Sequence, residues 1–183
     1  MRVSPGSAYR KLGKGSVAAV GLLLTVLGLL AFSALGADNP AGGPSQIALQ
    51  LAFSEEAFGR IVGQWGAEGV RIYRNVTLGL DYLFPIAYAL CLSGAMAWLT
   101  RTGSRGPTRA ELALFAMPWV AALLDWVENT LHLLLLQDVS RLSPALVLLA
   151  SLAAAAKWGL VLLSVLTILY RLLDRLRATR PVS

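Results

Sequence analysis

Polar side chains that could bind a ligand or move a proton fall inside an otherwise apolar stretch. The stretch "DWVENTLHLLLL" carries them at Asp125, Glu128, Asn129 and His132. Their spacing of i, i+3, i+4 and i+7 places all of them on one face of a helix. Carboxyl groups beside an imidazole can hold or transfer a proton, or bind a cationic group. The stripe therefore marks the face on which chemistry is expected.

A partner for these acids lies in the next apolar segment. A charged group at the centre of a membrane helix costs about 2.5–3.5 kcal/mol on insertion scales, so it must face away from lipid and be paired. Lys157 falls at the same depth as Asp125 when the two segments run in opposite directions. We therefore predict an ion pair from Lys157 to Asp125 or to Glu128.

The preceding apolar segment adds an acid and an aromatic ring. Asp81 stands at its head and is followed by "YLFPIAY", in which Pro85 can kink the helix and free a carbonyl group. We expect these groups to face inward and form a ligand-binding pocket together with the stripe and its partner, with these residues: Asp81, Tyr88, Asp125, Glu128, Asn129, His132 and Lys157. Such a polar set can equally serve as contacts that hold helices together, which is the structural alternative.

Several familiar chemistries need residues that the sequence lacks. With one histidine and one cysteine, a three-histidine zinc site and a cysteine metal cluster are excluded, and no metal or cofactor is expected. Cys91 and Ser93 lie at a different depth from His132, which argues against a nucleophile–base dyad. No residue is therefore assigned a catalytic role.

The composition indicates the elements that position these residues. The 183 residues are 56% hydrophobic and 14% charged, against about 45–50% and about 25% in soluble domains. Stretches long enough to span a bilayer lie at about 16–36, 78–99, 111–136 and 143–170. The sequence predicts an all-α, integral membrane four-helix bundle in a single domain, residues 1–183. The first stretch could instead be a signal peptide, but its apolar run is longer than the apolar region of such peptides.

The basic residues predict an orientation. The formal net charge is +6, and lysines and arginines cluster at the ends of apolar runs on one side, at these positions: Arg2, Arg10, Lys11, Lys14, Arg101, Arg105, Arg109, Arg171, Arg175, Arg177 and Arg180. By the positive-inside rule both termini should be cytoplasmic, in the inner membrane of a cell. This clustering follows membrane topology, so no nucleic-acid partner is expected.

A polar segment at 37–77 should lie on the outer side of the membrane. In "QIALQLAF" the alternating apolar residues are typical of a strand, although a short amphipathic helix also fits. Ser54 can cap a following helix whose apolar face runs from Ala57 to Trp65. That helix would lie on the bilayer, cap the bundle or act as a lid over an outward-facing cavity.

Parts of the sequence resemble known families. "FPIAY" after Asp81, a large outer loop and intramembrane acids resemble the EXPERA group, which includes emopamil-binding sterol isomerases and sigma-2 receptor-like proteins. The resemblance implies a cavity for a sterol-like molecule or a lipophilic amine. "DWVENTLH" matches no motif of that group, so no catalytic residue is carried over. The patterns "LD-x-LFP-x-x-Y" and "D-x-x-EN" are also similar to uncharacterised bacterial four-helix membrane proteins, which imply no activity.

Three functions are compatible with this sequence. The first is binding of a lipophilic or amphipathic ligand in an acid-lined pocket, with membrane lipid or a lipophilic small molecule as partner. The second is a structural or accessory subunit of a larger membrane complex. The third is a proton- or cation-coupled carrier, which would be a homodimer because one chain is small for that task.

Overall fold

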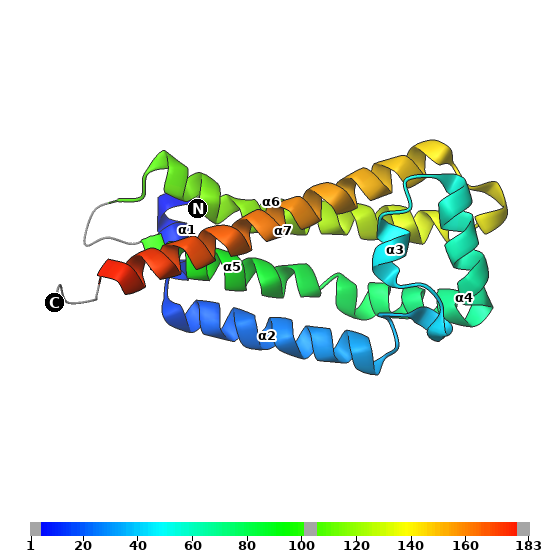
Figure 1. The fold of residues 1–183 in the computed structure, drawn as a ribbon, viewed down its shortest axis with the longest axis horizontal. Coiled ribbons are helices and arrows are strands. Elements are labelled where there is room, and N and C mark those ends of the chain that lie inside the picture. The colour runs from blue at the N-terminus through cyan, green and yellow to red at the C-terminus, as the bar shows by residue number, and fades with distance from the viewer. Residues whose placement is uncertain (1–4, 101–105, 179–183) are drawn as a thin grey trace.

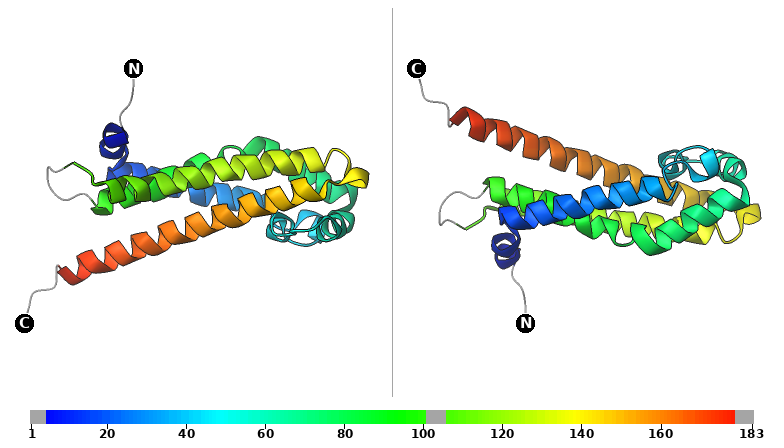
Figure 2. Two further views of the ribbon diagram at one scale, coloured as in Figure 1. Left: turned by 90° about the horizontal axis from the view of Figure 1, so that it is seen from above. Right: turned by 90° about the horizontal axis from the view of Figure 1, so that it is seen from below.

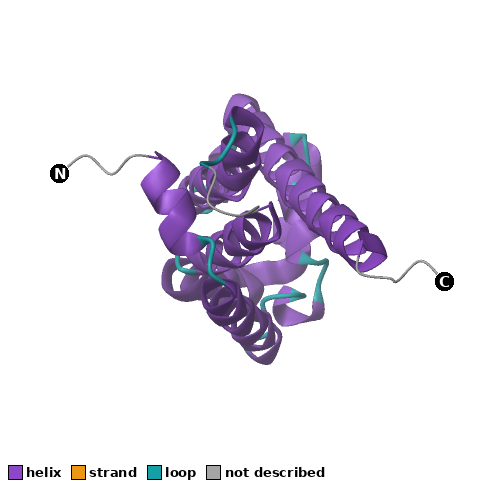
Figure 3. Cartoon of the chain, turned by 90° about the vertical axis from the view of Figure 1, so that its left-hand side faces the viewer, coloured by secondary structure: helices purple, strands orange, loops and turns teal. Residues whose placement is uncertain are grey.

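The structure is a computed structural model that describes residues 5–100 and 106–178, and within these ranges it contains helices and no strand (Figure 3). The expected all-helical class is confirmed. In chain order the elements are α1 (Pro5–Leu12), α2 (Gly15–Ala34), η1 (Pro40–Gly42), α3 (Gln46–Gln50), α4 (Glu55–Val76), η2 (Thr77–Asp81), α5 (Phe84–Thr100), α6 (Arg109–Leu135), η3 (Val139–Arg141) and α7 (Pro144–Ala178).

The long helices α2, α5, α6 and α7 lie side by side along the long axis of the molecule (Figure 1). The short helix α1 lies across one end, and α3 and α4 cover the opposite end (Figures 1 and 2). We call these the α1 end and the α4 end. The start of α1 and the finish of α7 are both at the α1 end. The two described chain ends therefore lie on the same side, which is the arrangement that the expected topology requires.

Among the described residues, three helices are long and apolar enough to cross a membrane: α2, α6 and α7. A fourth crossing is available if the segment Glu55–Asp81 and α5, which are bent by 46° at a short break, count as one span. Large apolar side chains cover the outside of α2 and α7, for example Leu30 and Leu162, which are 61% and 60% exposed. Such outward-facing leucines suit a lipid environment.

Residues 37–77, expected as an outer loop, are largely helical. The alternation in "QIALQLAF" belongs to the short helix α3 and not to a strand. Ser54 caps α4, as expected, by accepting a hydrogen bond from the amide of Ala57. However, α4 continues across a break at Gly66 to Val76, well beyond the predicted face, and its buried side chains pack on the ends of α6 and α7. The helix therefore caps the α4 end.

Small residues allow α2 and α5 to approach closely. A side chain at Gly21 would meet the backbone of Cys91, and one at Gly28 would lie 2.6 Å from the ring of Phe84. These contacts are within one chain. Close packing through small residues thus joins α2 to α5.

Candidate functional site

Lys157 lies at the centre of the polar cluster. Its Nζ is 3.1 Å from Oδ1 of Asp125 and 2.6 Å from Oε2 of Glu128, and all of these side chains are buried. The predicted ion pair between α6 and α7 is thus present with both of the acids that were named as alternatives. The contact with Asp125 is also a hydrogen bond, and that with Glu128 is an ion pair.

Asp125 is held from α5 as well. The hydroxyl of Tyr88 donates to Oδ2 of Asp125 at 3.1 Å, so both carboxyl oxygens of Asp125 have a donor. The ammonium of Lys157 also lies 5.2 Å from the ring centre of Trp158, at a distance suited to a cation–π contact. Tyr88, which was expected in this cluster, and Trp158 are therefore both in contact with its charged groups.

Asn129 supports the break before α5. Pro85 has no amide hydrogen to donate to the carbonyl of Asp81, four residues earlier. The side chain of Asn129 donates to that carbonyl at 3.1 Å, and the indole of Trp126 donates to the carbonyl of Tyr82 at 2.9 Å. The carbonyl that Pro85 was predicted to leave free thus has its partner on α6. Asn129 supplies that hydrogen bond to the backbone at the bend.

His132 joins α6 to α4. Its Nδ1 is 2.9 Å from the hydroxyl of Tyr73 and 3.8 Å from Oε1 of Glu128, and the ring is fully buried. Tyr73 was missed because it lies beyond the predicted helix. Extending the apolar face of α4 at spacings of three and four residues would have reached it, since the buried positions are Phe58, Val62, Trp65, Gly69, Tyr73 and Val76.

A cavity of about 410 Å³ opens beside this cluster, with walls from α2, α3, α5, α6 and α7. Of the seven predicted site residues, Asp81, Tyr88, Asp125 and Lys157 line it, whereas Glu128, Asn129 and His132 do not. The sequence had suggested α5, α6 and α7 as its walls. The helix α2, through Leu22 and Leu29, is a wall that was not expected.

The lining divides into an apolar body and two polar regions. The body is formed by side chains such as Phe32, Leu92, Val161 and Val165. Gln46 and Gln50 of α3 lie at the α4 end, and neither was singled out from the sequence. Asp125 and Lys157 with the neighbouring acid Asp81 and Tyr88 form the other polar region, which we call the acidic floor. Such a cavity can hold a molecule that is mostly apolar and has one polar group.

In the part of the chain that the structure describes, Ser93 and His132 are hydrogen-bonded to other groups. Cys91 lines the cavity, but Ser93 is buried and donates to the carbonyl of Ala89, and His132 contacts Tyr73. Ser93 and His132 therefore each have another hydrogen-bond partner, which is compatible with the predicted difference in depth. Across residues 5–100 and 106–178, no three His, Cys, Asp or Glu side chains are grouped so that they could hold a metal ion.

Comparisons with protein-family models, with curated proteins and with solved structures give no match for this chain.

Proposed function

We propose that this protein is a membrane protein that binds a lipophilic or amphipathic molecule in the cavity between α2 and α7. The observation that carries the proposal is a cavity of about 410 Å³ whose walls are apolar and whose floor holds Asp81, Asp125 and Lys157. Small-molecule sites typically have volumes of about 300–1,000 Å³ and combine apolar walls with a few polar groups.

Access from surrounding lipid is supported by the exposure of the lining residues. Leu22 and Leu29 on α2 are 55% and 54% exposed, and Trp158 on α7 is 42% exposed, although all three line the cavity. A side chain that faces both the cavity and the outside stands at an opening. We infer that a ligand enters sideways between α2 and α7.

The acidic floor favours a particular polar group on the ligand. Asp81 and Asp125 supply two carboxyl groups to this floor, and the ion pairs of Lys157 go to Asp125 and to Glu128, which lies outside the cavity. Asp81 takes no part in those pairs and faces the cavity. A ligand whose polar end donates hydrogen bonds or is positively charged would complement it.

The test is native mass spectrometry of the gently solubilised protein, with chemical analysis of what leaves with it. We expect a bound small molecule in the unmodified protein and its loss in Asp81→Asn, which changes a cavity carboxyl group without breaking the Lys157 pairs. The matched control is Asp138→Asn, because Asp138 is an exposed acid outside the cavity that caps η3. A bare protein, or equal occupancy in both variants, would refute ligand binding at this floor.

A structural role is the second candidate, and it is favoured by the three stripe residues outside the cavity. Glu128, Asn129 and His132 are fully buried and contact Lys157, the Asp81 carbonyl and Tyr73 within the chain. An accessory subunit would show this packing without any bound molecule. It would co-purify with other membrane proteins, which the same mass measurement detects. A coupled carrier would instead appear as a dimer.

The orientation belongs to the proposal too. Arg10, Lys11, Lys14, Arg109 and Arg171 all come from the ends of helices that meet at the α1 end. The positive-inside rule then places the α1 end in the cytoplasm and the α4 end outside. Labelling of single cysteines at Lys14 and at Glu56, in a Cys91→Ser background, would test this. Only the second site should react in intact cells.

A further inference from the structure

Residues 45–53, which we call the lid, close the cavity at the α4 end. They contain α3, and the side chains of Gln46, Ile47 and Gln50 line the cavity. In Figure 1 this helix stands between the end of α2 and the first half of α7. Before the lid, the indole of Trp65 donates to the carbonyl of Pro44 at 2.7 Å, which fixes that point to α4. After it, Ser54 begins α4.

The lid ends in a strained turn at Phe53. This residue has φ +53°, a left-handed value that is uncommon for a bulky residue. The amide of Ser54 donates to the carbonyl of Ala52 at 2.7 Å, an i to i+2 bond that makes Phe53 the central residue of a γ-turn. With positive φ this is the rare, strained form of the γ-turn. Such a conformation persists only where surrounding contacts hold it.

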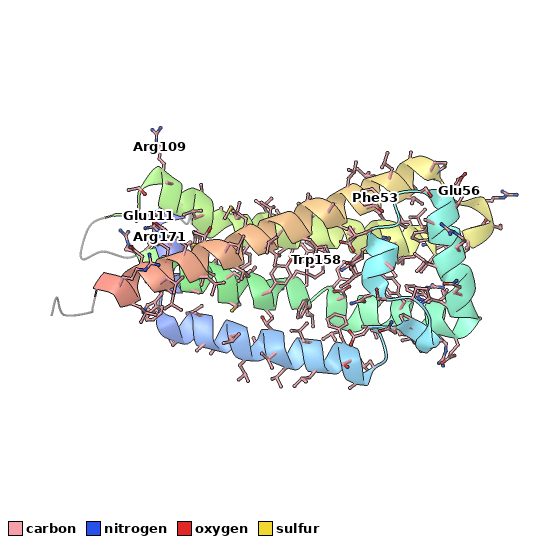
Figure 4. The ribbon with its side chains drawn as sticks, viewed as in Figure 1. Phe53, Glu56, Arg109, Glu111, Trp158 and Arg171 are labelled. Carbon is pink, nitrogen blue, oxygen red and sulfur yellow. The ribbon has the colours of Figure 1, made fainter. Side chains whose placement is uncertain are left out.

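Leu49 of the lid is fully buried in the core against α4 and α7, and the amide of Gln46 donates to the carbonyl of Asp38 at 3.0 Å. The remaining polar contacts of the lid come from α7. The amide of Phe53 donates to Oγ of Ser151 at 3.1 Å. The indole of Trp158 donates to Oε1 of Gln50 at 3.0 Å. Figure 4 shows Phe53 beside the first half of α7 and Trp158 below it, facing the space next to α3. Trp158 also lines the cavity, so its hydrogen bond to Gln50 joins the lid directly to the cavity wall.

We infer that residues 45–53 are a movable lid, held shut on the cavity by the hydrogen bonds from Phe53 to Ser151 and from Trp158 to Gln50. Release of these bonds lets Phe53 leave its left-handed conformation, which favours opening. The lid then swings between the fixed points at Pro44 and Ser54 and connects the cavity with the α4 end. The inference rests on the proposed function, because it describes a second route into that same cavity, from water at the α4 end.

Cys91 provides the test, because it is the one cysteine of the chain and it lines the cavity. The protein in lipid nanodiscs is treated with a trimethylammonium methanethiosulfonate, a permanently charged reagent that enters from water and not from lipid. The rate of Cys91 modification is followed by mass spectrometry. We expect Ser151→Ala and Gln50→Leu each to raise this rate about fivefold, the factor that corresponds to loss of one net hydrogen bond.

The matched control is Ser164→Ala on the same helix. Ser164 is buried and donates to the carbonyl of Leu160 within α7, so its loss should leave the rate unchanged. Unchanged rates in both lid variants, an equal rise in the control, or no reaction in any protein would overturn the inference. The reagent needs no natural ligand. A negative result in the labelling experiment therefore does not refute ligand binding. Conversely, a protein that carries no bound molecule can still show the expected change in labelling rate.

Discussion

Removal of the Lys157 ammonium should be the most damaging single change in the polar cluster. Lys157→Met leaves the carboxyl groups of Asp125 and Glu128 buried without their shared cation. Breaking a buried ion pair by removing one partner typically costs about 3–5 kcal/mol. For a chain of this size that corresponds to a fall of roughly 6–20 °C in the melting temperature.

The acids should respond less strongly. Asp125→Asn keeps an oxygen to accept from Tyr88, and Lys157 retains Glu128 at 2.6 Å. The expected loss is about 1.5–3 kcal/mol, as for a hydrogen bond to a charged group. Replacing all three charged groups, with Asn at Asp125, Gln at Glu128 and Met at Lys157, strands no charge. That triple variant should be more stable than Lys157→Met alone.

The assay is thermal unfolding in a mild detergent, with Lys14→Met as the control at an exposed lysine. Surface changes of this kind are usually within about 0.5 kcal/mol. A loss below about 1 kcal/mol for Lys157→Met would refute the reasoning, since that is the range of exposed salt bridges. A triple variant less stable than the single one would also refute it.

Further predictions concern the packing. Gly21→Ala should lower the free energy of unfolding by about 1–3 kcal/mol, the usual cost of overpacking a core, because the added methyl group meets the backbone of Cys91. Gly159→Ala has open space and should instead stabilise α7 by about 0.5–1 kcal/mol, with both measured by thermal unfolding. Tyr73→Phe leaves Nδ1 of His132 without its hydroxyl partner and should cost about 1–3 kcal/mol. Hydrogen exchange should then rise in α4 more than in α2, and a uniform rise would contradict the link between α4 and α6.

The polar contacts at mid-helix were largely predictable from the sequence. The cost of an unpaired charge and the equal depth of Asp125 and Lys157 determine that pair, which the structure contains. The missing amide of Pro85 likewise predicts a free carbonyl, although not that Asn129 would be its partner. These inferences succeeded because each depends on spacing within a regular helix.

The contacts of the segment before α5 were not predictable in the same way. The length of α4 depends on burial of its apolar side chains against α6 and α7. The break at Gly66, with φ +60°, interrupts the helix, so the sequence pattern does not show that the apolar face continues beyond it. The left-handed Phe53 contradicts local preference, since the sequence has a bulky residue where glycine would be favoured. The tertiary hydrogen bond from its amide to Ser151 supports this conformation, and no local pattern of the sequence predicts that bond.

The wide π-helical turn at Thr77–Asp81 has a consequence for how relatives of this chain should be aligned. A π-turn accommodates one more residue than an α-turn, and each residue of a helix rotates the chain by about 100°. Deleting Gly79, which has open space around it, would restore an α-turn and swing α4 around the axis of α5. Tyr73 would no longer reach His132. Between Tyr73 and Asp81, therefore, selection should preserve the number of residues.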